Sequence, residues 1–451
     1  MIPSIGAALA AIISGAALGI ASVSVVAAVG IRRAALAIFL IRPACDPLLD
    51  TGTGHQEMGL GAVINALIIG LAFLVFLESP VLIGSVILPM WGGFLVSALA
   101  SVVISPEPIR ALRVFFVLAS YAAAFALPFG IVRSKEKAMQ CLTVAMASSI
   151  IPVTYAIVEL ATWSEMTEGS IRLKSTLTHP NIFAFYLFSL LALTMFMLRS
   201  SLISLSARIK PWFVGYLPVI VVLIGLTGTR SAWIGTAIVL ITYASIVDRR
   251  YLLCLPLVPL VLYIPGVEDR ILDILDLGSG NVGYNYTTFN SYTWRNLMWE
   301  RTLKWLNDNP SLLLGYGLAS FRHYLPEFFF SEATKGGNDP HNAYLQIFFE
   351  MGIFGLLTFI WIFASLFIKL MRRYSFDKGG VIIMISLLAS YLIASYSDNM
   401  LDYLAFQWYF WFIMGVICAW NRLESVISGQ PADADRWKEA ALVPSPEEAP
   451  R

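Results

Sequence analysis

Hydrophobic residues in this sequence come in long unbroken runs and do not alternate with polar ones. A membrane-spanning helix needs roughly 17–25 mostly apolar residues, whereas a spanning strand alternates apolar and polar positions. Twelve runs fit the helical pattern, at 4–30, 60–77, 80–104, 109–131, 138–160, 182–199, 212–227, 232–247, 251–265, 343–368, 380–397 and 402–420. The pattern therefore predicts an all-α integral membrane protein with about 12 transmembrane helices.

Composition excludes the main soluble classes. Apolar residues make up 58% of the chain and charged residues 13%, against about 45–50% and about 25% in ordinary soluble domains. These values exclude a soluble globular enzyme and a disordered protein. The net charge of +1 gives no reason to expect nucleic acid as a partner. The four cysteines are isolated, which indicates neither a zinc site nor a disulfide framework.

The distribution of basic residues predicts the orientation in the membrane. With the N-terminus in the cytoplasm, 16 of the 30 Lys and Arg residues fall in inner loops or the C-terminal tail, and 8 in short outer segments. Cytoplasmic loops are the ones enriched in Lys and Arg, so both termini are predicted to be cytoplasmic. Arg32 and Arg33, just after the first helix, fit this orientation poorly.

One long loop then lies outside the membrane, and it divides the chain into four parts. These are 1–265 with nine helices, the extracytoplasmic loop 266–342, 343–420 with three helices, and a disordered tail 421–451. Within the loop, the pattern predicts a helix from Ser291 to Asn309 and a second, short helix from Leu318 to Leu325. Such a loop is either a cap over a membrane-embedded site or a docking surface.

Polar residues at the outer ends of membrane helices are the candidate site residues, because charges are costly at membrane depth. The segment 339–342 reads Asp-Pro-His-Asn, directly before an apolar run. Asp suits an N-cap and Pro the first helical position, which places His341 and Asn342 in the first helical turn. The positive end of the helix dipole there favours a neutral His341, which can accept a proton. A polar stripe from Asn342 through Gln346 to Glu350 follows; the alternative is a capped helix with an interfacial histidine.

Two further polar segments lie between apolar runs on the outer side. The segment 227–231 contains Arg230, whose planar fork of donors suits phosphate oxygens; the alternative is an arginine reaching the interface. The segment 172–181 repeats the pattern of cations followed by a polar cluster at a helix start, and it contains Arg172, Lys174, His179 and Asn181. His179 is equally well read as a structural residue near an N-cap, and Arg172 and Lys174 as loop charges.

The loop helix carries Arg295 and Arg301, six residues apart and therefore on different faces, so at most one is expected to face a site. Arg322 and His323 are assigned to a solvated face. The outer segments contain no D-x-D and no His, Asp and Glu cluster with metal-ligand spacing. No metal and no cofactor are predicted.

Five of these segments, taken in order, resemble motifs of the O-antigen ligase and Wzy-type polysaccharide polymerase superfamily. They are Ser97-Ala98 with Ser105-Pro106-Glu107-Pro108 (without the usual Trp), Ser175 to Asn181, Leu226 to Trp233, Arg295 to Trp299 with Asn309-Pro310 and Leu314 to Gly317, and Pro340 to Gln346 with Glu350 and Gly352. Each motif is weak by itself, but five in the family's order form a specific signal over about 97–360.

The resemblance implies a metal-independent, inverting membrane glycosyltransferase of the C type, with a donor glycan on undecaprenyl diphosphate. By position, His341 would be the base and would share the catalytic role with Arg230. Arg172, Arg230 and Arg295 would bind the diphosphate. The supporting residues would be Asn342, His179, Asn181 and Glu350.

The resemblance also implies a location in the bacterial inner membrane, with a periplasmic active site. The acceptor would be a second lipid-linked glycan in a polymerase, or the lipid A core in a ligase. Arg42-Pro43 with Asp46 resembles an element of exopolysaccharide polymerases, which favours the polymerase. A flippase and a chain-length regulator are candidate partners. A transporter of lipid-linked glycans is the alternative from another class.

Overall fold

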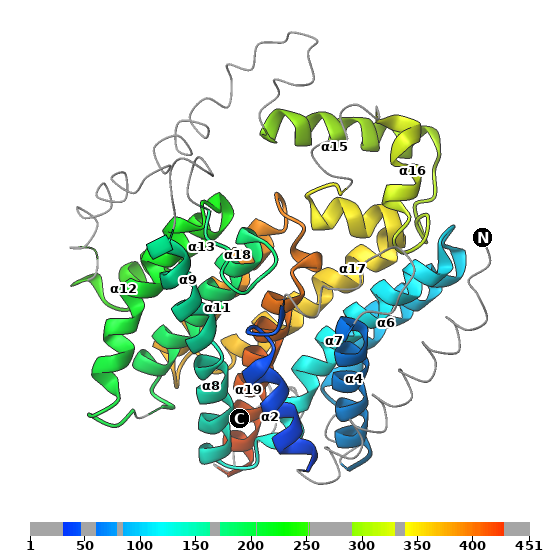
Figure 1. The fold of residues 1–451 in the computed structure, drawn as a ribbon. Coiled ribbons are helices and arrows are strands. Elements are labelled where there is room, and N and C mark those ends of the chain that lie inside the picture. The colour runs from blue at the N-terminus through cyan, green and yellow to red at the C-terminus, as the bar shows by residue number, and fades with distance from the viewer. Residues whose placement is uncertain are drawn as a thin grey trace, which may run out of the picture.

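The computed structural model describes residues 30–46, 60–78, 84–162, 172–203, 205–250, 252, 291–329 and 339–427. Within these ranges every regular element is a helix (Figure 1), as predicted. They are α2 (Ile31–Ile41), α4 (Leu60–Glu78), α6 (Ile87–Ile104), α7 (Pro108–Ile131), α8 (Lys135–Ala147), α9 (Ile150–Thr162), α11 (Pro180–Arg199), α12 (Lys210–Leu226), α13 (Arg230–Ile246), α15 (Ser291–Asp308), α16 (Phe321–Phe328), α17 (Ala343–Met371), α18 (Lys378–Ala394), the 3-10 turn η4 (Met400–Asp402) and α19 (Leu404–Ile427).

Ten of the twelve predicted runs coincide with apolar helices. Seven of the described spans are long and apolar enough to cross a membrane, and α12, α13 and α18 are shorter apolar helices. The span predicted at 138–160 is two helices, α8 and α9, broken at Ser148 and Ser149. The runs 4–30 and 251–265 and most of the tail 421–451 lie outside the described residues. The count of twelve spans and the four-part division therefore stay predictions.

The most buried helices are α19, α11 and α7, and α19 is the least apolar of the seven spans. Helix α19 contains a run of aromatic residues whose polar atoms are satisfied inside the bundle. Trp408 Nε1 donates to Ser120 Oγ (2.9 Å), and Gln407 Nε2 donates to Tyr391 OH (2.6 Å). Buried helices in a membrane can be polar, because neighbouring helices supply the partners that lipid cannot. The two most apolar spans, α17 and α4, are less buried than these three helices.

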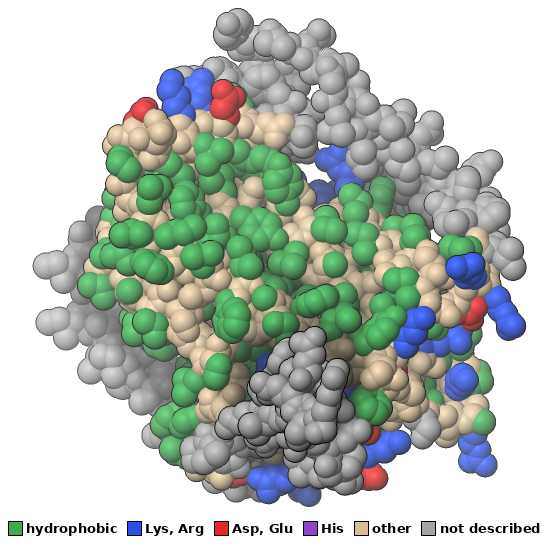
Figure 2. All heavy atoms as spheres, turned by 180° about the vertical axis from the view of Figure 1, so that it is seen from behind, with side chains coloured by type: hydrophobic (Ala, Val, Ile, Leu, Met, Phe, Trp, Pro, Cys, Tyr) green, Lys and Arg blue, Asp and Glu red, His purple; other side chains and the backbone are tan. Residues whose placement is uncertain are grey.

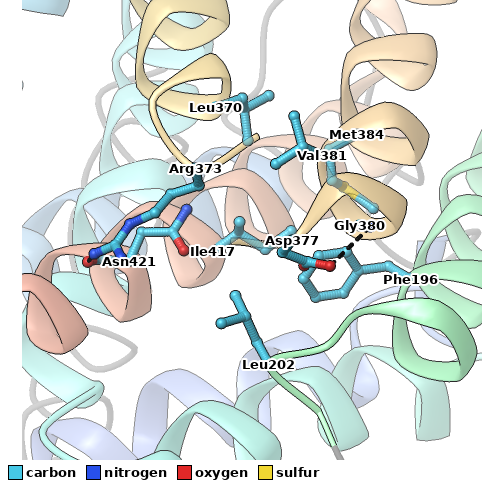
Figure 3. Close-up of a pocket in the computed structure, with 10 residues that line it drawn as sticks. All are labelled: Phe196, Leu202, Leu370, Arg373, Asp377, Gly380, Val381, Met384, Ile417 and Asn421. Atoms are coloured by element: carbon cyan, nitrogen blue, oxygen red, sulfur yellow. Dashed lines mark hydrogen bonds between the residues drawn. The ribbon is translucent and has the colours of Figure 1, made fainter. Parts of the chain in front are cut away.

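The end of the bundle opposite α15 is closed by Asp377, which caps α18. Its carboxylate accepts hydrogen bonds from Gly380 N (3.1 Å), Ser201 N (3.0 Å) and Ser200 Oγ (2.5 Å). Figure 3 shows this carboxylate on one side of a small pocket whose other walls include Arg373. Arg373 donates to the Asn421 carbonyl. These contacts join α11, α18 and α19, so the pocket is part of the structural closure of this end.

Helices α15 and α16 lie across the other end of the bundle (top of Figure 1), which we call the loop end. The predicted helix from Ser291 to Asn309 is confirmed as α15. The second helix begins later than predicted and continues through Pro326 to Phe328. The reason is that Gly317 (φ 100°) and Ala319 (φ 62°) are left-handed, so no helix can form before Ser320.

The loop is held against the bundle by backbone hydrogen bonds to α17. Tyr316 N donates to Phe349 O (2.9 Å), and Gly317 N donates to Glu350 O (3.0 Å). Helix α17 is interrupted at Gly352, where φ is 65°. A Cβ there would lie 2.3 Å from the Leu313 carbonyl oxygen, so only glycine fits. The motif segments 314–317 and 350–352 therefore meet in the fold and fix the loop.

Candidate functional site

Four segments meet at the loop end: the starts of α11, α13 and α17, and the turn between α18 and α19. Asn181 Nδ2, at the start of α11, donates to Asp398 Oδ1 (3.1 Å) and to Tyr403 OH (3.0 Å). Thr229 Oγ1, before α13, donates to Asn181 Oδ1 (3.1 Å). Ala343 N donates to Ser395 O (2.8 Å) and joins α17 to the end of α18. Sequence segments more than 200 residues apart thus form one polar network.

Asp398 lies at the centre of this network, and sequence analysis missed it. Its side chain is buried and accepts hydrogen bonds from Asn181, Ser231 and Tyr403 OH (2.8 Å). Burial raises the pKa of Asp398, while the hydrogen bond from Ser231 and the positive charge of Arg295 oppose that rise. The available signal was Asp398-Asn399 between the predicted runs 380–397 and 402–420, at the same predicted end of the membrane as the other candidates.

The predicted diphosphate ligands surround this network. Arg295 Nη1 donates to Ser397 O (2.6 Å), and Arg172 Nη2 donates to Asn181 Oδ1 (3.2 Å). Arg230 is the first residue of α13 and is followed directly by Ser231, which donates to Asp398. Lys174 has an exposed side chain. The structure therefore brings all three predicted arginines to one place.

Three helix N-termini add positive potential at this point. The N-caps are His179 for α11, Thr229 for α13 and Asn342 for α17. His179 Nδ1 accepts from Asn181 N (3.1 Å), which confirms the structural interpretation of this residue; its role in binding stays a prediction. Helix N-termini and arginines both favour anions, so the cluster is suited to a diphosphate.

His341 lies beside this network, but not where the sequence placed it. The prediction that His341 and Asn342 occupy the first helical turn is wrong: α17 begins at Ala343, and Asn342 is its N-cap. Asn342 Oδ1 accepts from Leu345 N (3.0 Å), and His341 has a left-handed backbone with φ 49°. The short Asn side chain, which bonds directly to the helix start, takes the capping role expected of Asp339.

The neighbours of His341 come from the loop helix α15. The Trp294 ring lies edge-on to the imidazole, with ring centroids 5.9 Å apart. Trp299 Nε1 donates to Pro340 O (2.6 Å), which holds the segment preceding His341 against α15. The segments 295–299 and 340–346, identified above as separate motifs, therefore pack together on one side of the site.

The surroundings of His341 favour the neutral imidazole. Burial lowers the pKa of His341 to about 4, with Arg295 and His179 adding to the effect and Asp339 opposing it. Among the described residues, Nδ1 has no hydrogen-bond partner. The predicted neutral state is supported, although its causes are burial and nearby cations, where the sequence suggested a helix dipole. A neutral imidazole with an unpartnered ring nitrogen can accept a proton.

Glu350 faces a different partner. Its Oε1 accepts from Phe321 N (3.4 Å), at the start of α16. The two ends of the predicted polar stripe thus have separate contacts: Asn342 caps α17, whereas Glu350 holds α16. The supporting role assigned to Glu350 stays a prediction.

Arg322 is exposed, as predicted, but its side chain is also ion-paired. Its Nε and Nη2 donate to the two carboxylate oxygens of Asp339, each at 2.6 Å. Asp339 precedes His341 by two residues, so this bidentate pair fixes the chain next to the imidazole. His323 is half-exposed, and its Nδ1 lies 3.6 Å from Glu107 Oε1.

A family model described as O-antigen ligase matches residues 215–360. This match confirms the resemblance to the O-antigen ligase and Wzy-type superfamily and supports a membrane glycosyl-transfer enzyme. The matched range includes Arg230, Arg295 and His341, and it does not include Arg172, Asn181 or Asp398. No curated protein matches the chain.

Proposed function

We propose that this chain transfers a glycan from undecaprenyl diphosphate to an acceptor hydroxyl at the periplasmic face of the inner membrane. One observation carries the proposal: His341 and the three arginines gather where the N-termini of α11, α13 and α17 converge. This arrangement supplies a base next to a site for a leaving diphosphate. Outside the cytoplasm there are no nucleotide sugars, so a lipid-linked donor is the natural source of an activated glycan.

The reaction is a single displacement. The acceptor hydroxyl attacks the anomeric carbon, while His341 accepts the hydroxyl proton. A new bond forms between the acceptor oxygen and this carbon, and the bond to the diphosphate oxygen breaks. The diphosphate leaves with the electron pair, and the configuration at the anomeric carbon inverts. Arg172, Arg230 and Arg295 stabilise the growing negative charge in place of a metal ion.

The buried partners give each group in this scheme a fixed place. Asp398 accepts from Ser231, next to Arg230, and its charge acts on Arg295. Asn181 connects Arg172 to the same carboxylate. Asp398 and Asn181 are therefore positioning residues that hold the arginines in a fixed arrangement. Charges fixed before the reaction stabilise the transition state most strongly.

We favour a polymerase of O-antigen or exopolysaccharide repeat units, with the lipid A core ligase as the second candidate. The cue is the element at Arg42-Pro43 and Asp46. In the structure Arg42 pairs with Asp46 inside the bundle, and Thr176 Oγ1 donates to Pro43 O (2.8 Å). This element therefore packs against the segment 175–181, which contributes Asn181 to the polar network. A flippase and a chain-length regulator remain candidate partners.

The glycans of a deletion strain test the function. We expect single repeat units on polyprenyl lipid and no long chains, with recovery on return of the wild-type chain and none with Arg230→Ala. Long chains left on polyprenyl, together with bare lipid A core, would instead identify the ligase. Unchanged polyprenyl-linked and surface glycans in the deletion strain would contradict both assignments.

Arg322→Ala is expected to lower kcat about tenfold, which corresponds to about 1.4 kcal/mol. Loss of the guanidinium leaves Asp339 without its bidentate partner, so the segment that positions His341 becomes less rigid. Arg322→Lys should recover only part of the activity, because an ammonium cannot make the bidentate contact. Glu327→Ala, at an exposed position of the same helix, is the control and should match wild type. Steady-state kinetics of purified variants measure the effect; equal rates in Arg322→Ala and Glu327→Ala would exclude this positioning role.

A further inference from the structure

The turn between α15 and α16 exposes three consecutive leucines. Leu312, Leu313 and Leu314 are 56%, 61% and 50% exposed. A loop that only covers a site from the water side has no reason to expose three adjacent large apolar side chains, because exposed apolar patches mark interaction surfaces.

This turn is bound to two membrane helices. Ile353 N, just after the break in α17, donates to Leu312 O (2.8 Å). Leu318 N donates to Ser101 O of α6 (3.0 Å), and Ser105 Oγ donates to Leu318 O (2.8 Å). The position of the leucines relative to the bilayer is therefore set by α6 and α17.

The lengths of these two helices give the depth of the turn. At about 1.5 Å per residue, α17 rises about 28 Å from Ile353 to Met371, close to the roughly 30 Å hydrocarbon core of a bilayer. Arg372 and Arg373 follow directly and mark the headgroups at the opposite end. Helix α6, from Ile87 to Ile104, spans a similar length of about 27 Å and ends beside the same turn. Leu312 therefore lies at the boundary of the hydrocarbon core.

The side chains next to the turn face lipid. Val103 of α6 is 82% exposed, and Phe354 and Leu357 of α17 are each more than half exposed. Outward-facing apolar residues of spanning helices contact acyl chains, and Figure 2 shows hydrophobic side chains spread over much of the face turned away from Figure 1. The backbone hydrogen bond from Ile353 to Leu312 joins the leucine turn directly to this exposed apolar part of α17.

We propose that Leu312, Leu313 and Leu314 insert into the acyl-chain region of the membrane and anchor the long loop in the lipid. The partner is bilayer lipid, since the turn extends an existing lipid-facing surface at matching depth. The anchor is mechanically connected to the site, because Tyr316 and Gly317 bind α17 directly after the leucines. The loop is thus held from two sides: by lipid at residues 312–314, and by Ser397 and Pro340 through Arg295 and Trp299.

Spin labels on the full-length protein in lipid nanodiscs test this proposal. The four native cysteines are replaced by alanine, and one cysteine is placed at Leu313, Leu303 or Ile360. Leu303, on α15, is 54% exposed and is the matched control for residue type and exposure; Ile360, in α17, is the lipid-facing reference. We expect the label at 313 to collide with oxygen rather than with a water-soluble nickel chelate, as at 360, and the label at 303 to show the reverse.

Two outcomes would overturn the anchor. Nickel accessibility at 313 equal to that at 303 would place the turn in water. Protection at 313 from both reagents, with dipolar broadening that disappears on dilution with unlabelled protein, would mean that a second copy covers the leucines. Because the readout is local and independent of catalysis, it stays informative if the proposed function fails. Gel filtration of each labelled variant checks that the protein is folded.

Discussion

Replacement of His341 is expected to lower glycosyl transfer by about 10²–10⁴-fold, the usual contribution of a general base. The protein should still accumulate in the membrane, because among the described residues no side-chain hydrogen bond involves the free Nδ1 atom. Alanine is strained at φ 49°, whereas asparagine adopts left-handed backbone readily. His341→Asn is therefore the better variant, since it removes the base and keeps the turn.

The pH dependence gives a second readout of the same residue. Because the pKa of His341 is about 4, the imidazole stays neutral as pH falls, and kcat/KM should hold until about pH 5 and decline only near pH 4. A bound diphosphate is negative and stabilises imidazolium, so the acid limb of kcat should lie at higher pH than that of kcat/KM.

The depressed pKa also means that acid destabilises the fold: the unfolded histidine binds protons first as pH falls below about 6.5.

His323→Asn is the control for this experiment, since His323 is half-exposed on α16. Transfer of a labelled lipid-linked glycan by purified variants across pH measures both effects. Near wild-type transfer by His341→Asn would remove this residue from the proton transfer. An acid limb of kcat/KM near pH 6.5 would mean that the titrating base is a different, solvated group.

The helices were predictable from local pattern, whereas the centre of the site was not. Runs such as 109–131 and 182–199 match α7 and α11 closely, because a span is a local property of about 20 residues. Asp398 has partners 167 and 217 residues away in Ser231 and Asn181. No local pattern shows such contacts, so the carboxylate at the centre was missed, although the arginines around it were identified.

The error at His341 has a different origin. Asp-Pro before an apolar run is a good helix start, and so is an asparagine three residues later in the same stretch. Local sequence could not decide between two competing caps. Asp339 instead pairs with Arg322, which leaves Asn342 as the cap. Tertiary contact therefore shifted the helix start and moved His341 out of α17, into a left-handed position beside Trp294.

Replacement of Arg295 by alanine is expected to lower kcat/KM by about 10²–10³-fold, or about 2.7–4 kcal/mol, by analogy with the loss of one transition-state hydrogen-bond donor. Arg295 donates to Ser397 O at one Nη, and a guanidinium has further N–H donors for a ligand. Its charge acts on both His341 and Asp398, so it is within electrostatic reach of the base and of the buried carboxylate. The leaving diphosphate should therefore interact with it most strongly as charge develops.

Arg301→Ala is the matched control, because it removes the same charge from the same helix on another face. Arg295→Ala should also raise the pKa of His341, since one of the cations that lowers it is gone, and the acid limb of the remaining activity should move to higher pH. Arg295→Lys should keep the acid limb near its wild-type position and yet recover little of the rate, because a point charge restores the field but not the planar fork. Equal losses of kcat/KM in Arg295→Ala and Arg301→Ala, with no shift of the acid limb, would mean that α15 contributes only its positive charge at long range. A loss confined to position 295, accompanied by that shift, would mean that one arginine acts on both the base and the leaving diphosphate.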